Sequence, residues 1–267
     1  MRVLTLNLWA RHGDWPARRE ALREGLRRLS PDVVLLQEAV VDDAGDSAAE
    51  LLGDGYTIVH QTIGLVGDGT HHGASVASRW PLGAVHEVDL HLTPRTGDYS
   101  SGAVIAEVLA PEPVGRLLAV SHGPSWPWWA EAERELQALA VVRRIEELAG
   151  RAHVVVGGDF NAEPATSSLR FWTGKQSLDG TSTAYRDCWE SVHGDEPGWT
   201  FGPANPLSHH DEPHLDRGRR IDYLLVRCGD HGPSLRIADC RRVFDEPVGG
   251  VMASDHYGVV ADLDPLS

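Results

Sequence analysis

The apolar runs at residues 33–36 and 153–156 constrain the fold more than any other feature of this chain. Each run is short enough to be a buried strand, and each ends where glycine or polar residues begin. Residues 2–8 alternate two kinds of side chain, with the leucines on one side, as a strand with two different faces does. An amphipathic segment separates this strand from the run at 33–36. The opening order of strand, helix and strand predicts an α/β fold.

Two helices are predicted from the spacing of apolar residues. The first follows Asp14, which can cap a helix, and has Pro16 in its first turn. Its apolar residues recur on one face, and Arg18 is expected on the opposite face with the other charged residues of the segment. The second helix covers residues 131–148 and ends at Gly150, since glycine often follows the last residue of a helix.

The rest of the chain is predicted to add strands to the same domain. Turns rich in Pro, Gly and Asp separate apolar segments at residues 74–77, 85–90, 103–109, 117–121, 221–227 and 257–263. No stretch has the composition of a flexible linker, and candidate reactive residues occur at both ends and in the middle. Residues 1–267 are therefore predicted to form a single α/β domain whose strands converge on one site.

Charge and sequence patterning argue against several classes of protein. The formal net charge of −15 opposes a non-specific grip on nucleic acid, because such binding depends on Lys and Arg replacing counterions. The first residues lack the apolar stretch and cleavage site of a secretory signal, and no window is apolar enough for a membrane span, so a cytoplasmic protein is expected. The three cysteines show neither a C-x-x-C spacing nor a disulfide framework.

The segment GGDFNAEP, at residues 157–164, carries the most specific group of polar residues. Asp159 and Asn161 follow two glycines that permit close approach of the backbone. On an extended backbone their spacing points both side chains in the same direction. A carboxylate beside a neutral amide can position a water molecule and hold a phosphoryl oxygen without adding a second negative charge. The alternative is an Asx turn that leads into a helix near Ser167.

Two other strand boundaries carry groups suited to metal or acid–base chemistry. Glu38 follows the run at 33–36, where a sheet would present it at an edge, with a surface or capping glutamate as the alternative. Asp255 and His256 are adjacent just before the last predicted strand. Asp255 can bind a hard cation and His256 can donate to a phosphoryl oxygen, or the pair can cap a turn.

Asp222 lies near the start of the strand predicted at residues 221–227. A carboxylate at this position can hydrogen-bond an imidazole, fix its tautomer and raise its basicity. A salt bridge with Arg219 or Arg220 is the alternative.

Taken together, these segments resemble one family. The order and approximate spacing of the endonuclease/exonuclease/phosphatase superfamily are found in the strings LTLNLW, LLQEAV, GGDFNAEP, RRIDYLLV and ASDHYGVV. Each string alone is a modest signal, but the five in order cover nearly the whole chain. The resemblance implies a four-layer α/β/β/α sandwich, with two packed mixed sheets and helices outside, as in deoxyribonuclease-like proteins. It also implies a divalent cation at one end of the sandwich.

The resemblance assigns the cation ligands residue by residue. Glu38 resembles the principal metal ligand, and Asn7 and Asp255 resemble further ligands or residues that support them. Oxygen ligands without cysteine favour Mg²⁺ over zinc, with Mn²⁺ as a substitute.

The resemblance also assigns catalytic roles. Asp159 resembles the residue that orients or deprotonates the attacking water, and Asn161 the residue that contacts the scissile phosphate. His256 resembles the histidine that stabilises the transition state while hydrogen-bonded to Asp222. Such roles fit the chemistry, because water attack on an anionic phosphate needs charge neutralisation and an aligned nucleophile.

His122 resembles a second histidine that contacts phosphate. The match is incomplete, because Gly123 stands where many members have Leu or Phe. The deoxyribonuclease branch supports this histidine with an Arg–Glu pair, and Ser101 and Gly102 occupy those places here. A catalytic role is predicted, with a core histidine as the alternative.

Two loops supply candidates for substrate contact. Trp126 lies in the loop GPSWPWW after His122 and is predicted to stack on a base, sugar or other ring or to touch lipid, with packing on the following helix as the alternative. Asn205 lies where family members often contact the leaving group. The histidines at 71–72 and the segment at 209–214 have no fixed geometry for a transition metal, so a solvated loop is expected for His209, His210, Asp211 and His214.

These observations predict a Mg²⁺-dependent phosphoesterase that acts by metal-assisted, in-line attack of water. A phosphodiesterase or phosphatase for a small or lipid-like phosphate ester is favoured by the acidic charge and the lack of basic clusters. The alternative is a DNA or RNA nuclease of the same superfamily. A binding module without catalysis is disfavoured by the joint presence of Glu38, Asp159, Asn161, Asp222 and His256.

Overall fold

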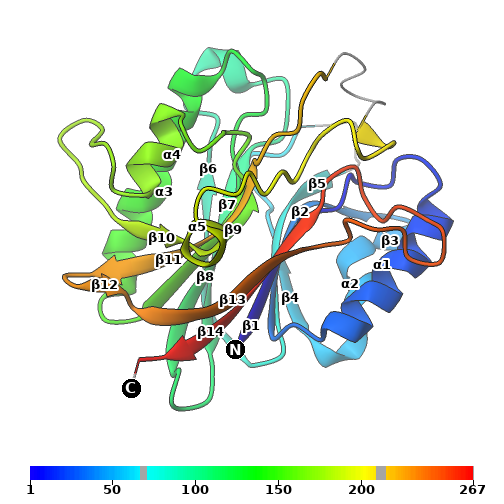
Figure 1. The fold of residues 1–267 in the computed structure, drawn as a ribbon, viewed down its shortest axis with the longest axis horizontal. Helices are drawn as coiled ribbons and strands as arrows, with labels where there is room; N and C mark the ends of the chain where they lie inside the picture. Colours follow the sequence, from blue (N-terminus) through cyan, green and yellow to red (C-terminus); the bar gives the residue numbers. More distant parts are fainter. Residues whose placement is uncertain (67–70, 209–214, 267) are drawn as a thin grey trace.

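The protein has four layers (Figure 1). A computed structural model describes residues 1–66, 71–208 and 215–266. Two seven-stranded sheets pack face to face, and helices cover the outer face of each sheet. This arrangement confirms the predicted α/β/β/α sandwich of two mixed sheets.

The first sheet contains β1 (Arg2–Asn7), β2 (Val33–Asp42), β3 (Gly45–Asp46), β4 (Thr57–His60), β5 (His71–Ser78), β13 (Leu235–Val243) and β14 (Gly258–Pro265). Its spatial order is β13–β14–β1–β2–β5–β4, and β3 pairs with β2. β1 and β2 are parallel, and the other neighbours are antiparallel. The two ends of the chain therefore lie side by side in one sheet.

The second sheet contains β6 (Leu82–Asp89), β7 (Gly102–Leu109), β8 (Arg116–Gly123), β9 (His153–Asp159), β10 (Tyr185–Asp187), β11 (Asp222–Gly229) and β12 (Gly232–Pro233). Its order is β10–β11–β9–β8–β7–β6, and β12 pairs with β11. β8 and β9 form its parallel pair. Each sheet thus contains one parallel pair joined by a helix.

The helices are α1 (Trp15–Leu29), α2 (Ser47–Leu52), α3 (Glu131–Ala149), α4 (Ser167–Trp172) and α5 (Cys188–His193), with short 3-10 turns at Gly53–Gly55 and Pro94–Thr96. α1 and α3 match the two predicted helices, and the Asp14 carboxylate accepts a hydrogen bond from Ala17 N at 3.2 Å, as expected of a cap. Among the described residues, no helix is both long and apolar enough to cross a membrane.

Three hydrophobic clusters hold the layers together. The central one lies between the sheets and includes Val76, Val104 and Leu224. A second packs the first sheet against α1 and α2, and a third packs the second sheet against α3 and α4. Alternate side chains of each strand supply the two sides of a sheet, so each sheet is apolar on both faces.

The sequence analysis did not predict β13 or α5. Within the described part of the chain, β13 is an edge strand that pairs only with β14, and its exposed or half-buried positions include Arg236, Asp239 and Arg241. A register shift between Ile237 and Asp239 also interrupts its alternation. An edge strand with charged side chains and a bulge lacks the apolar pattern by which buried strands are recognised.

Close backbone approach in the second sheet explains one of the two glycines before Asp159. Gly158 lies between β8 and β11, opposite His122 on one side and Tyr223 on the other. A Cβ atom at Gly158 would lie 1.9 Å from the backbone oxygen of His122. Only a glycine therefore fits at this position.

We expect Gly158→Ala to lower the free energy of unfolding by about 2–4 kcal/mol, because two strands must separate to admit the methyl group. Chemical denaturation followed by circular dichroism measures this loss. Gly229→Ala is the matched control at the end of β11, since a Cβ atom there meets nothing within 4 Å. Equal stability of the two variants would contradict the proposed close packing.

Candidate active site

Most of the predicted site residues meet at one end of the sandwich. A cleft there has a volume of about 440 Å³ and is lined by seven of them, namely Asn7, Glu38, Trp126, Asp159, Asn161, Asp255 and His256. A larger hollow of about 630 Å³ lies along α1 and α2, but it is lined by charged residues of those helices and holds none of the predicted groups. The predicted catalytic and metal-binding groups therefore gather at the smaller cleft.

Glu38 reaches the cleft because β2 is irregular at this point. The pairing of β2 with β5 shifts register between Leu36 and Ala39. Glu38 has a φ of +54°, in the left-handed region, which costs a non-glycine residue on the order of 1–3 kcal/mol. A bulge of this kind turns a side chain away from the regular alternation of the strand. The strained backbone thus directs the carboxylate into the cleft.

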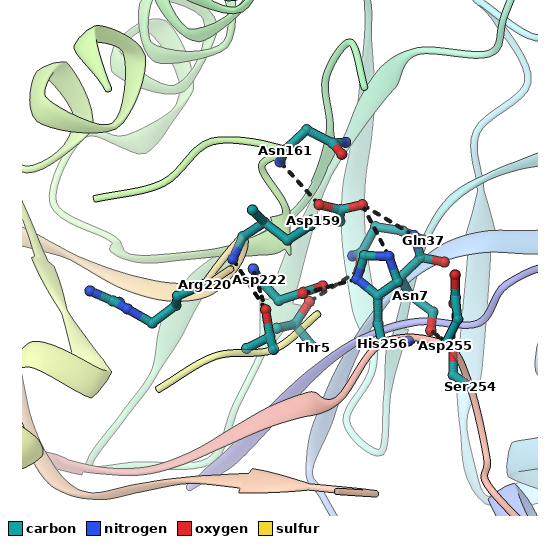
Figure 2. Close-up of polar contacts among 12 residues, drawn as sticks. Thr5, Asn7, Gln37, Asp159, Asn161, Arg220, Asp222, Ser254, Asp255 and His256 are labelled. Atoms are coloured by element: carbon teal, nitrogen blue, oxygen red, sulfur yellow. Dashed lines mark hydrogen bonds and ion pairs between the residues drawn. The ribbon is translucent and has the colours of Figure 1, made fainter. Parts of the chain in front are cut away.

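Asn7 connects the acidic groups of the two sheets. Its Nδ2 donates to Glu38 Oε1 at 3.0 Å and to Asp159 Oδ2 at 3.2 Å, the second of which is drawn in Figure 2. Its Oδ1 accepts a hydrogen bond from Trp9 N at 2.9 Å. The amide therefore holds two carboxylates in place, and its oxygen is already used by the backbone.

The Asp159–Asn161 segment forms a tight turn at the end of β9. Asp159 Oδ1 accepts from Asn161 N at 3.0 Å, and Asn161 has a φ of +51° (Figure 2). This contact is the Asx turn that the sequence left as an alternative. Both residues still line the cleft, so the turn is compatible with a role in the site.

His256 and Asp222 form a buried carboxylate–imidazole pair. Nδ1 of His256 lies 3.0 Å from Asp222 Oδ2 and therefore donates to it, while Nε2 lies 3.9 Å from Asp159 Oδ2 (Figure 2). Ligand atoms of these three residues all lie within 4.8 Å of one another. The alternative salt bridge of Asp222 is not formed, since Arg220 pairs with Asp187 and Arg219 with Glu163.

Burial and charge act on this pair in opposite directions. Burial alone would lower the pKa of His256, but the carboxylates of Asp222, Asp255 and Asp159 outweigh it and raise that pKa well above its usual value. Burial raises the pKa of Asp222 to about 6, although the nearby imidazole opposes the shift. His256 is therefore held in its protonated form, with Nε2 directed toward Asp159.

Asp255 lies against the N-terminal strand. Ser254 Oγ lies 2.8 Å from Asn7 O and 3.1 Å from Asp255 Oδ1, so one hydroxyl links the loop before β14 to β1. This contact fixes the Asp255 carboxylate next to the residues that the first strand contributes.

The structure places Arg18 differently from the prediction. It was expected on the charged face of α1, but only 2% of it is exposed. Its guanidinium donates to the backbone oxygens of Leu8, His12 and Ala253 and so ties together the segments that border the cleft. Burial lowers the pKa of Arg18 to about 10, while Asp255 and Glu38 oppose the shift. The sequence did indicate this burial. Residues three and four positions apart lie on the same face of a helix, and Arg18 precedes the buried Ala21 and Leu22 by three and four residues.

His122 does not line the cleft. Its ring packs against Phe160 and Trp172, with centroids 5.0 and 5.7 Å apart, and only 1% of the residue is exposed. Burial lowers its pKa to about 3, so the imidazole is neutral. The structure thus places His122 in the core, and a contact with phosphate does not fit this position.

Asn205 is also placed differently from the prediction. It is fully buried, and its Nδ2 donates to the backbone oxygens of Ser254 and Asp255, each at 2.9 Å. Its Oδ1 accepts from Leu207 N at 3.0 Å. Nδ2 therefore holds the loop that carries Asp255 and His256, Oδ1 holds the turn of Asn205 itself, and neither atom is left for a substrate.

The remaining candidates lie in loops. Trp126 lines the cleft and is 57% exposed, so it does not pack on α3 as the alternative reading required. His72 also lines the cleft, whereas the cluster of His209, His210, Asp211 and His214 lies outside the described residues. The sequence analysis missed Tyr99, Phe201 and Arg219 as parts of the cleft wall. They come from loops without periodic patterns, so nothing in the sequence marked them.

Comparisons with known proteins identify the family and the fold. The model of the Endonuclease/Exonuclease/phosphatase family matches residues 4–256. No curated protein matches the sequence.

Solved structures share the fold over nearly the full chain. D. rerio TDP2 complexed with single strand DNA product has a TM-score of 0.75 at 19% identity, covering 99% of this chain and 98% of that chain. The human Nocturnin catalytic domain with bound sulfate anion has a TM-score of 0.75 at 18% identity, with 100% and 94% covered. The endonuclease/exonuclease/phosphatase from Bacteroides vulgatus has a TM-score of 0.74 at 19% identity, with 99% and 98% covered.

We expect Asn205→Ala to lower the free energy of unfolding by about 1–3 kcal/mol, because two buried carbonyl groups lose their donor. Denaturation measures the loss, and kinetics with an aryl phosphate ester should show a fall in kcat with little change in KM. A rise in KM at unchanged stability would instead assign Asn205 to substrate binding.

Proposed function

Because the chain belongs to the endonuclease/exonuclease/phosphatase family, we propose that residues 1–267 form one domain that hydrolyses a phosphate ester by in-line attack of water. Members of this family are hydrolases that act on phosphate esters. The observation that carries the proposal is the convergence of Asp159, Asp222 and His256 within 4.8 Å beside the Asn7–Glu38 contact. Such a set can activate a nucleophile and stabilise charge at the same place.

Asp159 is the group that positions the attacking water. Its two oxygens are oriented by Asn7 Nδ2 and by Asn161 N, so the carboxylate cannot rotate freely. A fixed carboxylate accepts a hydrogen bond from water and receives its proton as the new P–O bond forms. The P–O bond to the alcohol breaks on the opposite side, and the departing oxygen takes up a proton from solvent. Asn161, which lines the cleft beside it, contacts a phosphoryl oxygen through its amide.

His256 stabilises the charge that develops on phosphorus-bound oxygen. Its ring is held between Phe201, with centroids 4.7 Å apart, and the Asp222 carboxylate. The raised pKa keeps Nε2 protonated, so this atom donates to a non-bridging oxygen of the substrate. Asp222 fixes the tautomer of the ring and compensates its positive charge.

The donors of the cleft fit a hard divalent cation such as Mg²⁺, with Mn²⁺ as a substitute. Glu38 and Asp255 supply carboxylate oxygens, Asn7 holds Glu38 in place, and no cysteine is among the described residues that line the cleft. Acidic groups also outnumber the single arginine in that lining. A bound cation would offset this negative charge and neutralise the phosphate.

The charge of the protein favours a small or lipid-like phosphate ester over a long polynucleotide. The net charge is −15, and Arg219 is the single Arg or Lys among the described residues that line the cleft. A polynucleotide needs a row of such residues along its phosphates. A nuclease is the alternative function, favoured by the structural likeness to a TDP2 complexed with a DNA product.

Replacing Asp159 by Asn or His256 by Ala should each lower kcat at least about hundredfold, because the base or the charge-stabilising donor is lost. Hydrolysis of bis(p-nitrophenyl) phosphate and p-nitrophenyl phosphate with Mg²⁺ measures the effect. Asp179→Asn and His231→Ala are matched controls at exposed positions and should keep normal rates. Near-normal turnover in either active-site variant would remove the role assigned to that residue.

Mg²⁺ should raise the thermal unfolding temperature of the protein, because a ligand that binds only the folded state stabilises it. A chelator should abolish both this shift and the hydrolysis. Glu38→Gln removes one charged ligand and should abolish most of the shift, whereas Glu147→Gln, at an exposed site on α3, should leave it intact. A full shift in Glu38→Gln would show that the cation binds elsewhere.

A further inference from the structure

Three tryptophans stand exposed on the loop between β8 and α3. The exposed fractions are 57% for Trp126, 54% for Trp128 and 55% for Trp129. Large aromatic side chains grouped at a surface mark a place where something binds, because leaving them in water is unfavourable. The catalytic assignments do not use this loop.

The loop is held in one conformation by two buried residues of α3. Arg134 Nη1 donates to the backbone oxygens of Ser125 and Pro127 at 3.0 and 2.9 Å. Gln137 accepts from Ser125 N at 3.0 Å and donates to Ser125 Oγ at 2.7 Å. The exposure of the rings is therefore a fixed property of the fold, and a ligand meets a surface that is already formed.

Two of the three rings are already covered by arginine. The Arg219 guanidinium lies 3.9 Å from the centroid of the Trp128 ring, and that of Arg95 lies 4.3 Å from Trp129. Arg95 in turn pairs with Glu133 at 3.1 Å. Insertion of these rings into a lipid surface would carry ionic groups out of water, which is costly. The loop is therefore poorly suited to anchor the protein in a membrane.

Trp126 differs from its neighbours. It lines the catalytic cleft, and among the described residues no cation lies over its ring. Tyr99 packs against it with ring centroids 6.0 Å apart and an interplanar angle of 62°. Trp126 thus presents an exposed aromatic surface at the cleft, and Tyr99 supports it.

We propose that Trp126 and Tyr99 form a subsite for a nucleobase, so that the substrate is a nucleotide-sized phosphate ester. The ring of a base stacks on the exposed face of Trp126, and Tyr99 holds the Trp126 ring in position from the other side of the contact. The inference rests on the proposed function, because it places the scissile phosphate at Asp159 and His256. It favours nucleotides over the lipid-like phosphate esters of the proposed function.

The size and charge of the cleft fit this class. A volume of about 440 Å³ lies in the range of sites for small molecules. With one arginine in the described lining, the cleft can contact few phosphates, which suits a mononucleotide or dinucleotide better than a polymer.

The test compares two ligands that differ only in the base. They are the methylene phosphonate analogues of adenosine 5′-monophosphate and of ribose 5-phosphate, whose P–C bond is not hydrolysed as an ester. Isothermal titration of the Mg²⁺-loaded protein should show that the adenosine analogue binds about tenfold or more tightly. Trp126→Ala should reduce this ratio below about threefold, and Trp126→Phe should keep most of it. Trp129→Ala, on the same loop and equally exposed, should leave the ratio unchanged.

Equal affinities for the two analogues in the natural protein, or a ratio that survives Trp126→Ala, would overturn the proposal. So would binding to phosphatidylcholine–sphingomyelin vesicles that Trp126→Ala and Trp129→Ala weaken equally, since the loop would then be a membrane surface. These titrations do not require turnover. A failure of the proposed hydrolysis would appear separately, as absent turnover of p-nitrophenyl phosphate esters at a normal affinity ratio.

Discussion

The hydrogen bonds of Asn7 to Glu38 and Asp159 are the contact on which the site depends. They join the end of β1 to a bulge in β2 and to the end of β9, so one amide connects both sheets. Carboxylates that converge in a partly buried cleft repel one another, and they stay together only where donors or cations compensate them. The neutral amide of Asn7 donates two hydrogen bonds and adds no charge to the cleft. Removing it would leave the two carboxylates to separate.

Strained and buried residues in and around the cleft maintain this arrangement at some energetic cost. Glu38 holds a left-handed backbone conformation, and Arg18 is buried at a lowered pKa to gather the loops around the first sheet. Asn205 performs the same task for the loop of Asp255 and His256. Strain and buried polar groups of this kind persist when the surrounding packing fixes them. The three hydrophobic clusters provide that packing, which is why the rigid part of the molecule is the sandwich and the chemistry lies at its end.

The sequence predicted the elements whose signal is local. Apolar runs marked the buried strands, and the polar residues that end them marked Glu38, Asp159 and the Asp255–His256 pair. Orientation was harder, because a side chain on a strand or loop is placed by its neighbours in space. His122 was expected to face phosphate and instead packs against Phe160 and Trp172, on helices and strands distant in sequence. Asn205 lies in a loop, and a loop has no periodic pattern that indicates which backbone groups a side chain will contact. Arg18 alone had a readable signal, since helical spacing placed it beside Ala21 and Leu22.

Each group of the cleft comes from a segment of the chain in which hydrogen bonds can hold it rigid. The groups proposed to move protons or bind a cation lie at the end of β9, in the bulge of β2 and in the loop before β14, where hydrogen bonds to neighbouring segments hold them. The group proposed to meet the rest of the substrate, Trp126, comes from a loop outside the two sheets, and a buried arginine and a buried glutamine hydrogen-bond the backbone of that loop. This bracing holds the exposed rings in place before any ligand binds. A scaffold shared across a family can in this way keep one chemistry while a single braced loop decides which ester it accepts.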